Sequence, residues 1–591
     1  MAGKSKSRSS ARPAAQGEGG TQSHNSTWLG GVLLPALMSA IALWAAFAPL
    51  DLHLLAWIAP GGWLLIAHRK QPVGRAGYVS LWLSGCVFWL LILHGIRLAF
   101  WPLYFGWILL SLYLAVYVPL FVGITRSLHH RLRWPLVLAA PVAWVGMELA
   151  RSYLLTGFAG NTLAHSQAHW PMVIQLADQL GTGGIGFVMI VVCCAILQLG
   201  LARSSSLAWR PALASTTTAC VLVSSLLGYG WWKLREWDRL IANRPPLLRA
   251  LLVQENTPTI FEYDPGKNQL AWTRYLNTTR DAVRKLGKPN VVIWPESTFT
   301  ANEPLMEADL SGTVVPSDLA ELGYDAAALH MRIGDMNRVI EFKIGSLLNA
   351  SLGRAADESI ANAVASEHAA HLLVGNDLMI YKTAGLERYN TALFIGPKGE
   401  VKDRYSKMHR VMVGEYMPLE PVFGWLSKLF GQGTIQAGQD PKSFPIYMPE
   451  GVVRLSPSIC FESMVPQLIS WQVRQLARSG QTPDVLVNIS NDSWFRGSSA
   501  LDHHLASSIL TAVENRRPML VAANTGITAE IESSGRVLQS TERMVAEAIL
   551  AEPRRDSRWG LVQVWGYPLS WLCLILCCLS LLGLRQRALK T

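Results

Sequence analysis

Long apolar segments near both ends of the chain constrain its fold more than any other feature. A membrane-spanning helix needs about 20 mainly apolar residues, and half of the 591 residues are hydrophobic while only 16% are charged. The apolar runs lie at about 30–49, 52–68, 78–99, 102–124, 134–154, 183–202, 211–232 and 566–584. The sequence therefore predicts a polytopic α-helical membrane domain with eight spans.

The basic residues give these spans an orientation. Groups of basic residues lie in the segments 4–12, 68–75, 126–133, 203–210 and 585–590. With eight spans, every group falls on one side of the membrane, as the positive-inside rule requires, and one span more or fewer would separate them. Both termini are then cytoplasmic. The net charge of +11 is accounted for by this topology, so we expect no nucleic-acid partner.

The expected organisation has four parts. Residues 1–27 are rich in small and basic residues and are predicted to be disordered. A signal peptide is the alternative for this start, but a second apolar run follows the first at once, which favours an uncleaved helix. Residues 28–235 are expected to hold seven transmembrane helices, 236–560 a polar domain outside the cytoplasm, and 566–585 the eighth helix.

The polar region alternates between strand-like and helix-like segments. Strand-like runs lie at 247–253, 291–294, 372–375, 392–395, 452–459, 485–489 and 519–523, and helical stretches at 270–286 and 501–515. This alternation predicts an α/β domain with a β-sheet core. The insert 301–369 is partly helical and carries no motif that indicates a function.

Cys460 is the only cysteine between Cys220 and Cys573. It ends the strand-like run 452–459, two residues before Glu462, and a thiol in that place suits a nucleophile. On the cysteine alone, however, a buried small hydrophobic residue is the favoured interpretation. No cysteine spacing indicates a metal site or a disulfide framework, and His503-His504 lacks a ligand partner at useful spacing.

Two further charged residues lie near strand ends. Glu296 follows the run 291–294 and Pro295, which cannot continue a central ladder, and active-site groups of α/β sheets gather outside strand ends. Lys407 lies in a basic stretch in which Lys398 and Lys402 compete with it. Taken singly, Glu296 fits an exposed loop and Lys407 a solvated basic loop better than a functional role. Trp494 and Phe495, near the end of the run 485–489, suit either an acyl pocket or the core.

Glu296, Lys407 and Cys460, in this chain order, resemble the Glu-Lys-Cys triad of the nitrilase superfamily. With the apolar runs included, residues 30–585 resemble the apolipoprotein N-acyltransferase family. That likeness extends to Phe47-Ala48-Pro49, to Trp144, Glu148 and Arg151 with Thr156-Gly157-Phe158, to Gly414-Glu415 and to Asn524-Thr525-Gly526-Ile527-Thr528.

The resemblance implies a nitrilase-like domain, a four-layer α-β-β-α sandwich, between the last two spans. It implies that Glu296 is a general base, Lys407 an oxyanion-stabilising cation and Cys460 the nucleophile, supported by Glu415 and Glu462. No metal or other cofactor is implied.

The implied activity is transfer of a fatty acyl chain from a phospholipid to the N-terminal amine of a diacylglyceryl-cysteine apolipoprotein. A thioester on the cysteine would be the intermediate of this ping-pong reaction. The implied location is the bacterial inner membrane, with a monomeric enzyme whose catalytic domain is periplasmic.

Several expectations concern the surroundings of this site. The segment 422–430, with Trp425 and Phe430, is expected to contact lipid, although a helix packed on the domain is equally consistent. Glu148 and Arg151 lie near the end of the fifth span, where charges are costly and often functional, but an ion pair between helices is the simpler interpretation. The alternatives for the whole chain are a membrane-anchored nitrilase-type amidase and a transporter or lipid-binding protein. The joint presence of the triad argues against the second.

Overall fold

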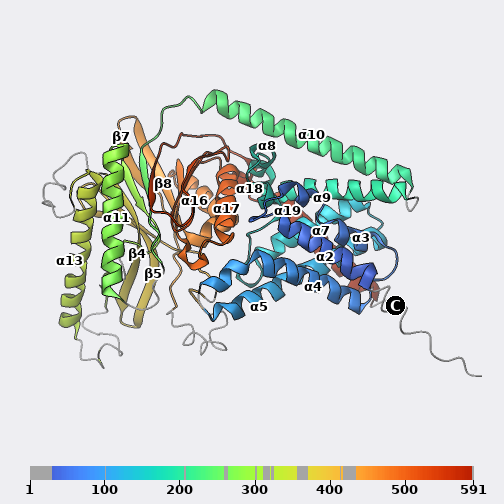
Figure 1. Ribbon diagram of the computed structural model, residues 1–591, viewed down its shortest axis with the longest axis horizontal. Coiled ribbons are helices and arrows are strands. Elements are labelled where there is room, and N and C mark those ends of the chain that lie inside the picture. Colours follow the sequence, from blue (N-terminus) through green and yellow to red (C-terminus); the bar gives the residue numbers. More distant parts are fainter. Residues whose placement is uncertain are drawn as a thin grey trace, which may run out of the picture.

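The computed structural model describes residues 29–99, 101–204, 208–258, 264–299, 303–310, 320, 325–355, 370–412, 414–416 and 434–588. A helical bundle and an α/β domain lie beside each other along the longest axis of the molecule (Figure 1). The predicted disordered segment 1–27 and the segment 422–430, with Trp425 and Phe430, lie outside the described residues.

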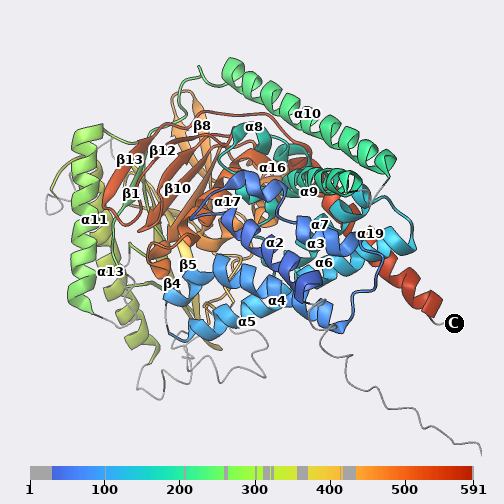
Figure 2. The same cartoon turned by 45° about the vertical axis from the view of Figure 1, so that its right-hand side comes forward.

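The bundle is built from the predicted apolar runs. Its helices are α2 (Leu34–Ala45), α3 (Gly61–His68), α4 (Arg75–Ile92), α5 (Leu103–Ala115), α6 (Tyr117–Arg126), α7 (Leu136–Arg151), α9 (Ala177–Arg203), α10 (Trp209–Leu240) and α19 (Pro568–Ala588). The short helices α8 (Pro171–Ile174) and α18 (Leu561–Trp565) lie at the junction with the α/β domain. Figure 2 shows the same bundle turned toward the viewer.

Four helical segments of the described chain are long and apolar enough to cross a membrane, judged by length and composition. They are Arg75–Ile92, Leu103–Arg131, Ala177–Arg203 and Trp209–Leu240, and the shorter apolar helices Gly31–Ala45 and Pro568–Leu582 accompany them. The second predicted span, 52–68, is split into a 3₁₀ turn at His53–Trp57 and the eight residues of α3, which rise about 12 Å. The prediction of eight spans therefore stays a prediction.

The α/β domain contains two β-sheets. One has the strand order β13-β1-β2-β4-β5-β6, with β3 paired to β4, and the other has the order β12-β11-β10-β9-β8-β7. The strands of the first sheet are β1 (Ala250–Gln254), β2 (Val291–Trp294), β3 (Leu305–Asp309), β4 (His371–Lys382), β5 (Gly385–Ile395), β6 (Val401–Ser406) and β13 (Glu547–Ala551). Those of the second are β7 (Phe444–Met448), β8 (Gly451–Ile459), β9 (Val485–Asn491), β10 (Met519–Asn524), β11 (Ala529–Ile531) and β12 (Val537–Ser540).

Alternation along the strands produces four layers. Leu252 and Ile293 of the first sheet share a buried core with Val487 and Leu520 of the second. The intervening residues Leu251 and Val253 pack instead against α11 (Pro265–Leu286) and α13 (Ala326–Ser351). The opposite face of the second sheet is covered by α16 (Pro466–Arg478) and α17 (Ala500–Asn515), as Figure 1 shows. The nitrilase-like part of the fold prediction is thus confirmed.

All seven strand-like runs of the sequence analysis coincide with strands. The strands that it missed are β3, β6, β7, β11, β12 and β13. These strands lie toward the edges of the two sheets, and β3 pairs with β4 outside the main strand order. Their apolar runs are short, because strands near an edge need not be apolar on both faces. β12, for example, is exposed along most of its length.

Helix α17 joins the α/β domain to the bundle. Fourteen of its 16 residues are buried. Its apolar residues Ile509 and Val513 belong to one core cluster with Val521 of β10 and with Ile190 of α9. Because the sheet covers one face of α17 and the bundle another, the two parts share a continuous core.

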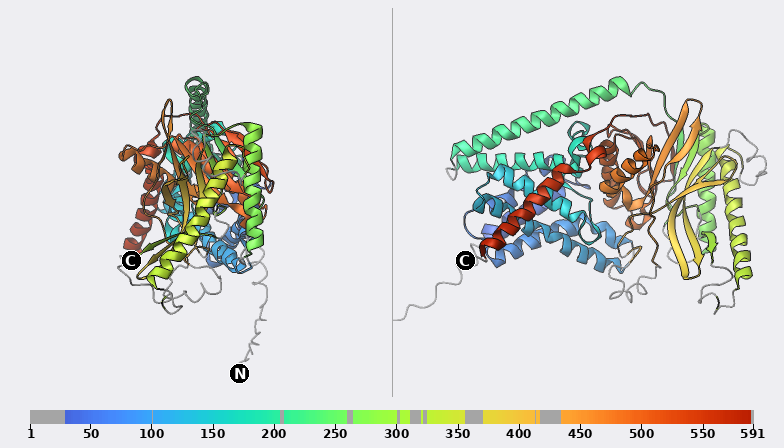
Figure 3. Two further views of the ribbon diagram at one scale, coloured as in Figure 1. Left: turned by 90° about the vertical axis from the view of Figure 1, so that its left-hand side faces the viewer. Right: turned by 180° about the vertical axis from the view of Figure 1, so that it is seen from behind.

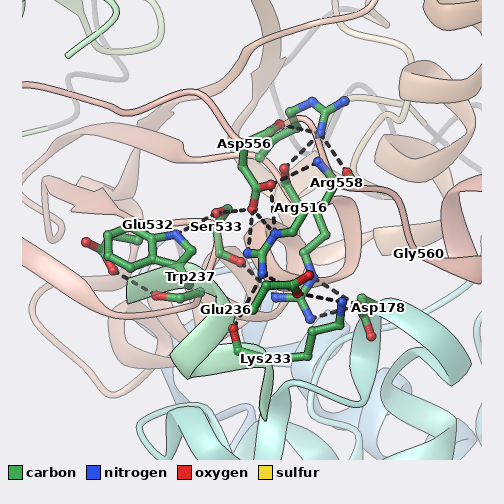
Figure 4. A network of polar contacts seen from close by, with 12 residues as sticks. Asp178, Lys233, Glu236, Trp237, Arg516, Glu532, Ser533, Asp556, Arg558 and Gly560 are labelled. Atoms are coloured by element: carbon green, nitrogen blue, oxygen red, sulfur yellow. Dashed lines mark hydrogen bonds and ion pairs between the residues drawn. The ribbon is translucent and has the colours of Figure 1, made fainter. Parts of the chain in front are cut away.

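A buried ionic network closes the same junction (Figure 4). The guanidinium of Arg516, just after α17, donates to Asp178 Oδ2 at the start of α9 through Nε at 2.9 Å and Nη2 at 2.7 Å. Tyr229 of α10 donates to Oδ1 of the same carboxylate at 2.8 Å. Since both charges are shielded from solvent, the loss of either would leave the other buried without compensation.

We expect Asp178→Ala to lower the free energy of unfolding by about 3–5 kcal/mol, because Arg516 would remain buried and unpaired. Thermal unfolding of detergent-solubilised protein, followed by tryptophan fluorescence, measures the effect. The control is Asp335→Ala, which breaks the exposed Arg338–Asp335 pair of α13 and should cost less than about 1 kcal/mol. Equal shifts in Tm for the two variants would contradict the assigned role of the network.

Candidate active site

Three strand ends bring Glu296, Lys407 and Cys460 together. Glu296 lies two residues beyond β2, Lys407 directly follows β6, and Cys460 directly follows β8. β2 and β6 belong to one sheet and β8 to the other, so the site forms where the two sheets face each other. The Lys407 ammonium lies 3.3 Å from Glu296 Oε1, and Cys460 is in electrostatic contact with both charges.

Three different elements hold the Glu296 carboxylate. Asn390 of β5 donates its side-chain amide to Oε1 at 2.6 Å, and the backbone N–H of Asn491 donates to Oε2 at 2.9 Å. Lys407 completes the set on Oε1. Only 7% of Glu296 is exposed, and its two oxygens accept hydrogen bonds from residues on β5, on β9 and directly after β6. This carboxylate is therefore fixed in place and can accept a proton.

Gly375 of β4 allows the backbone before Glu296 to approach the sheet. A Cβ on Gly375 would lie 2.4 Å from the carbonyl oxygen of Pro295 and 2.5 Å from Glu296 Cα. Ser297 has a φ of 53°, in the left-handed region, so the chain turns sharply directly after the carboxylate. Glycine at position 375 is thus a steric condition for the position of Glu296.

Lys407 is a buried cation between two carboxylates. Its ammonium donates to Glu415 Oε1 at 2.6 Å as well as to Glu296, and the residue is 1% exposed. Burial alone would lower the pKa of Lys407, but Glu296 and Glu415 hold it well above its usual range. The side chain therefore carries its positive charge beside the thiol at neutral pH.

Cys460 is held in an unusual backbone conformation. Its φ is 54°, a left-handed value that disfavours every residue with a side chain. The thiol is partly buried, and its pKa is raised well above the usual range by burial and then by Glu296, while Lys407 opposes the shift. The resting group is thus a thiol, which needs a base before it can act as a nucleophile.

Glu462 ties the cysteine turn to the lysine loop. Its carboxylate accepts the backbone N–H of Ile459 at 2.7 Å, and it also accepts the N–H groups of Met408 at 2.7 Å and His409 at 2.9 Å. The phenol of Tyr405 donates to both of its oxygens. Because one buried side chain binds the residues that flank Cys460 and Lys407, it fixes the separation of the two groups.

The surroundings of the site are aromatic. Phe461 packs against Phe158 from the bundle, with ring centroids 6.1 Å apart, and against His409 at 6.0 Å. Trp494 and Phe495 lie, partly buried, in a short 3₁₀ turn directly after β9. Of these, Phe461 connects the cysteine turn with the bundle, and the sequence analysis did not single it out.

The ion pair between helices that was expected for Glu148 and Arg151 is wrong. Both residues lie on the same helix, α7, so a pair between them would not join two helices. Glu148 Oε1 accepts the N–H of Leu163 at 2.8 Å, and Arg151 donates to the carbonyl of Gly160 at 2.9 Å. Each side chain therefore holds the irregular segment that follows α7.

Asn390 and Asn491 hold Glu296, yet the sequence analysis did not assign them that role. Asn491 is the last residue of β9 and Asn390 lies inside β5, and neither position by itself indicates a contact with Glu296. Among the described residues, no group of three or more His, Cys, Asp or Glu is arranged to hold a metal ion.

Comparison with known proteins connects this site to a family. Residues 252–552 match the model described as carbon-nitrogen hydrolase, and residues 39–195 match the model described as apolipoprotein N-acyltransferase N-terminal domain. The α/β part is thus a carbon-nitrogen hydrolase domain.

Curated relatives extend the match to nearly the whole chain. The apolipoprotein N-acyltransferase of Rhodopirellula baltica is 31% identical over 551 residues, which cover 90% of this chain and 93% of that protein. The protein of the same name from Geobacter metallireducens is 26% identical and covers 91% of this chain and 92% of its own length. A solved nitrilase-superfamily protein of Saccharomyces cerevisiae matches with a TM-score of 0.32 and 13% identity, over 52% of this chain and 90% of that one. The chain belongs to the apolipoprotein N-acyltransferase family.

The charges around Cys460 predict opposite effects for its two neighbours. Glu296→Gln removes a carboxylate that raises the pKa of Cys460, so the thiolate fraction at neutral pH should rise, by up to about tenfold for one pKa unit. Lys407→Met removes the opposing cation and should lower the thiolate fraction of Cys460. The measurement is the rate of Cys460 alkylation by iodoacetamide, followed by peptide mass spectrometry.

Glu400→Gln, at a partly exposed carboxylate of the turn before β6, is the control for charge removal alone and should leave the rate unchanged. Slower alkylation in both Glu296→Gln and Lys407→Met would contradict the electrostatic account.

Proposed function

We propose that this chain transfers a fatty acyl chain from a phospholipid to the N-terminal amine of a diacylglyceryl-cysteine apolipoprotein. Cys460 carries the acyl group as a thioester between two half-reactions. Glu296 is the general base and Lys407 the cation that stabilises the oxyanion, with Glu415 and Glu462 in supporting positions. The observation that carries the proposal is the buried Glu296–Lys407 pair in electrostatic contact with a protonated Cys460 thiol.

In the first half-reaction, Glu296 takes the thiol proton and the sulfur attacks the carbonyl carbon of the phospholipid ester. Lys407 stabilises the negative charge on the former carbonyl oxygen, a contribution of about 3–4 kcal/mol per donor in comparable sites. The ester C–O bond then breaks. The proton on Glu296 passes to the leaving lysophospholipid oxygen, which leaves a thioester on Cys460.

In the second half-reaction, the neutral amine of the lipoprotein attacks the thioester. The new C–N bond forms and the C–S bond breaks. Glu296 takes the proton that the amine loses and passes it to the sulfur, which restores the thiol. Glu296 serves both halves because it is bound by Asn390, Asn491 and Lys407, which keep it within reach of the reacting atoms.

The bundle supports a membrane location for this chemistry, because both proposed substrates carry lipid chains. Basic segments gather at the end of the bundle that lies away from the sheets. There Arg126 donates to the carbonyls of Arg69 at 2.6 Å and Gln71 at 2.8 Å, and α19 runs to the same end (Figure 3). This distribution supports the eight-span topology, with both termini in the cytoplasm.

Aromatic side chains are exposed at the end of the bundle that adjoins the α/β domain. Tryptophan and tyrosine are enriched where a membrane helix meets the interface. The exposed residues are Tyr153, Trp231, Trp232, Trp565 and Trp571. Their position supports placing the periplasmic surface of the inner membrane at the level of the domain junction, with the α/β domain in the periplasm.

A membrane-anchored amidase of the nitrilase type is the second candidate, since the same three residues would serve hydrolysis. The difference lies in the acceptor: a hydrolase passes its acyl group to water, whereas the proposed transferase passes it to an amine. The partial burial of Cys460 and the aromatic packing of Phe461 favour an acceptor other than water.

Intact mass spectrometry after incubation with phospholipid tests the first half-reaction. We expect an acyl-sized adduct that hydroxylamine removes and that Cys460→Ala lacks, because the thioester forms on that sulfur. Cys220→Ala, at an exposed cysteine on α10, should keep the adduct. Addition of a diacylated lipopeptide should discharge it into an N-acyl product. Release of free fatty acid with no N-acyl product would instead identify an amidase.

A further inference from the structure

A buried histidine on α17 lies behind the cysteine turn. His504 Nδ1 is 3.1 Å from Asp492 Oδ1, and the two residues are 8% and 2% exposed. Ser490 also donates to Asp492 Oδ1, at 2.7 Å. The carboxylate is therefore fixed from two sides and orients the imidazole ring, in a part of the site that the proposed mechanism does not use.

Helix α17, which carries His504, packs against the turn that begins at Cys460. The Nε2 atom of His504 is buried and makes no hydrogen bond to any residue that the structure describes. The backbone carbonyl of Cys460 nevertheless interacts with the ring and favours its protonated form. Since Nδ1 lies against Asp492, we assign the interaction with this carbonyl to Nε2.

The cysteine turn requires support from outside its own segment. The left-handed backbone of Cys460, with a φ of 54°, disfavours a residue with a side chain, and such conformations persist only where neighbours enforce them. Its carbonyl oxygen accepts the Asn488 side-chain amide at 3.2 Å and the Ser463 hydroxyl at 3.3 Å. Both bonds are long, so a charged donor on the same oxygen would strengthen the hold.

We propose that His504 is a positioning residue for the nucleophile. Its protonated ring, fixed by Asp492, donates through Nε2 to the carbonyl of Cys460 and keeps the sulfur aimed between Glu296 and Lys407. This inference rests on the proposed role of Cys460 as the nucleophile.

The charge on His504 follows from the groups that face it. Burial alone would lower its pKa, but Asp492 of the turn after β9, the carbonyl of Cys460 and Glu296 beyond β2 raise it above the usual value. The neutral ring would turn a lone pair on Nε2 toward the carbonyl oxygen. The support is therefore complete at low and neutral pH and is lost as the pH rises through the raised pKa.

His503 provides a matched comparison one residue away. Its ring packs edge-on against Phe47 from the bundle, with centroids 6.0 Å apart. Burial first and then His94 lower its pKa to about 4, so it is neutral at physiological pH. His165 of the bundle also lies in electrostatic range of His503. None of the interactions described for the Cys460 turn involves His503.

The test compares His504→Gln, His504→Ala and the control His503→Gln. The readouts are the rate of acyl-adduct formation on Cys460 and the rate of its alkylation, each from about pH 6 to about pH 9. We expect His504→Ala to slow acyl-adduct formation about 10- to 100-fold at neutral pH. His504→Gln should retain most of the native rate, because its amide still donates to the carbonyl. His503→Gln should match the native protein.

The pH profile separates positioning from simple structural damage. In the native protein, the rate constant for the Cys460 thiolate should fall at alkaline pH as His504 loses its proton, and in His504→Gln this fall should be absent. The proposal is overturned if glutamine and alanine are equally impaired with native-like pH profiles, or if both behave as His503→Gln does. If His504→Ala fails to fold, the His504→Gln profile still decides.

Failure of the His504 proposal can be distinguished from failure of the proposed function. If Cys460→Ala still forms the acyl adduct, the thioester mechanism is wrong. The alkylation profile of Cys460 in His504→Gln would still report whether His504 acts on the cysteine turn.

Discussion

The burial of the Lys407 ammonium between Glu296 and Glu415 is the interaction on which the site depends. A cation that is 1% exposed requires both carboxylates, because a buried charge without compensation costs several kcal/mol. The same arrangement sets the state of Cys460: the carboxylates disfavour a resting thiolate and Lys407 favours the anion that forms during reaction. One cluster of charges thus keeps the sulfur unreactive until a base removes its proton.

The architecture holds that cluster at one end of the α/β domain, beside the helical bundle. Three charged or nucleophilic groups come from the ends of strands in two facing sheets, and Glu462 binds two of the loops together with hydrogen bonds of 2.7–2.9 Å. Helix α17 then joins the second sheet to the bundle through a shared apolar core, and the Asp178–Arg516 pair closes the junction. Because the same helix carries His504, packing against the bundle and support of the cysteine turn are properties of one element.

Much of the fold followed from local patterns. Apolar runs marked every helix of the bundle longer than one or two turns, and strand-like runs marked the central strands, because burial on both faces demands continuous apolar residues. The flanking strands, such as β12, escaped since partly exposed strands carry short or alternating patterns. The ion pair between helices that was expected for Glu148 and Arg151 is absent, because both residues lie on α7 and bind the backbone of the segment that follows it.

The sequence by itself determined which segments are apolar, where the central strands end, and the chain order of Glu296, Lys407 and Cys460, since these are properties of neighbouring residues. Spacing alone did not distinguish Lys407 from Lys398 and Lys402, and the tertiary structure supplied the physical reason: the Lys407 ammonium contacts a carboxylate 111 residues away. The tertiary structure alone assigned Asn491, 195 residues from Glu296, to the orientation of that carboxylate. The left-handed turn at Cys460 and the burial of the His504 ring were also decided by the tertiary structure, because both depend on contacts between distant segments.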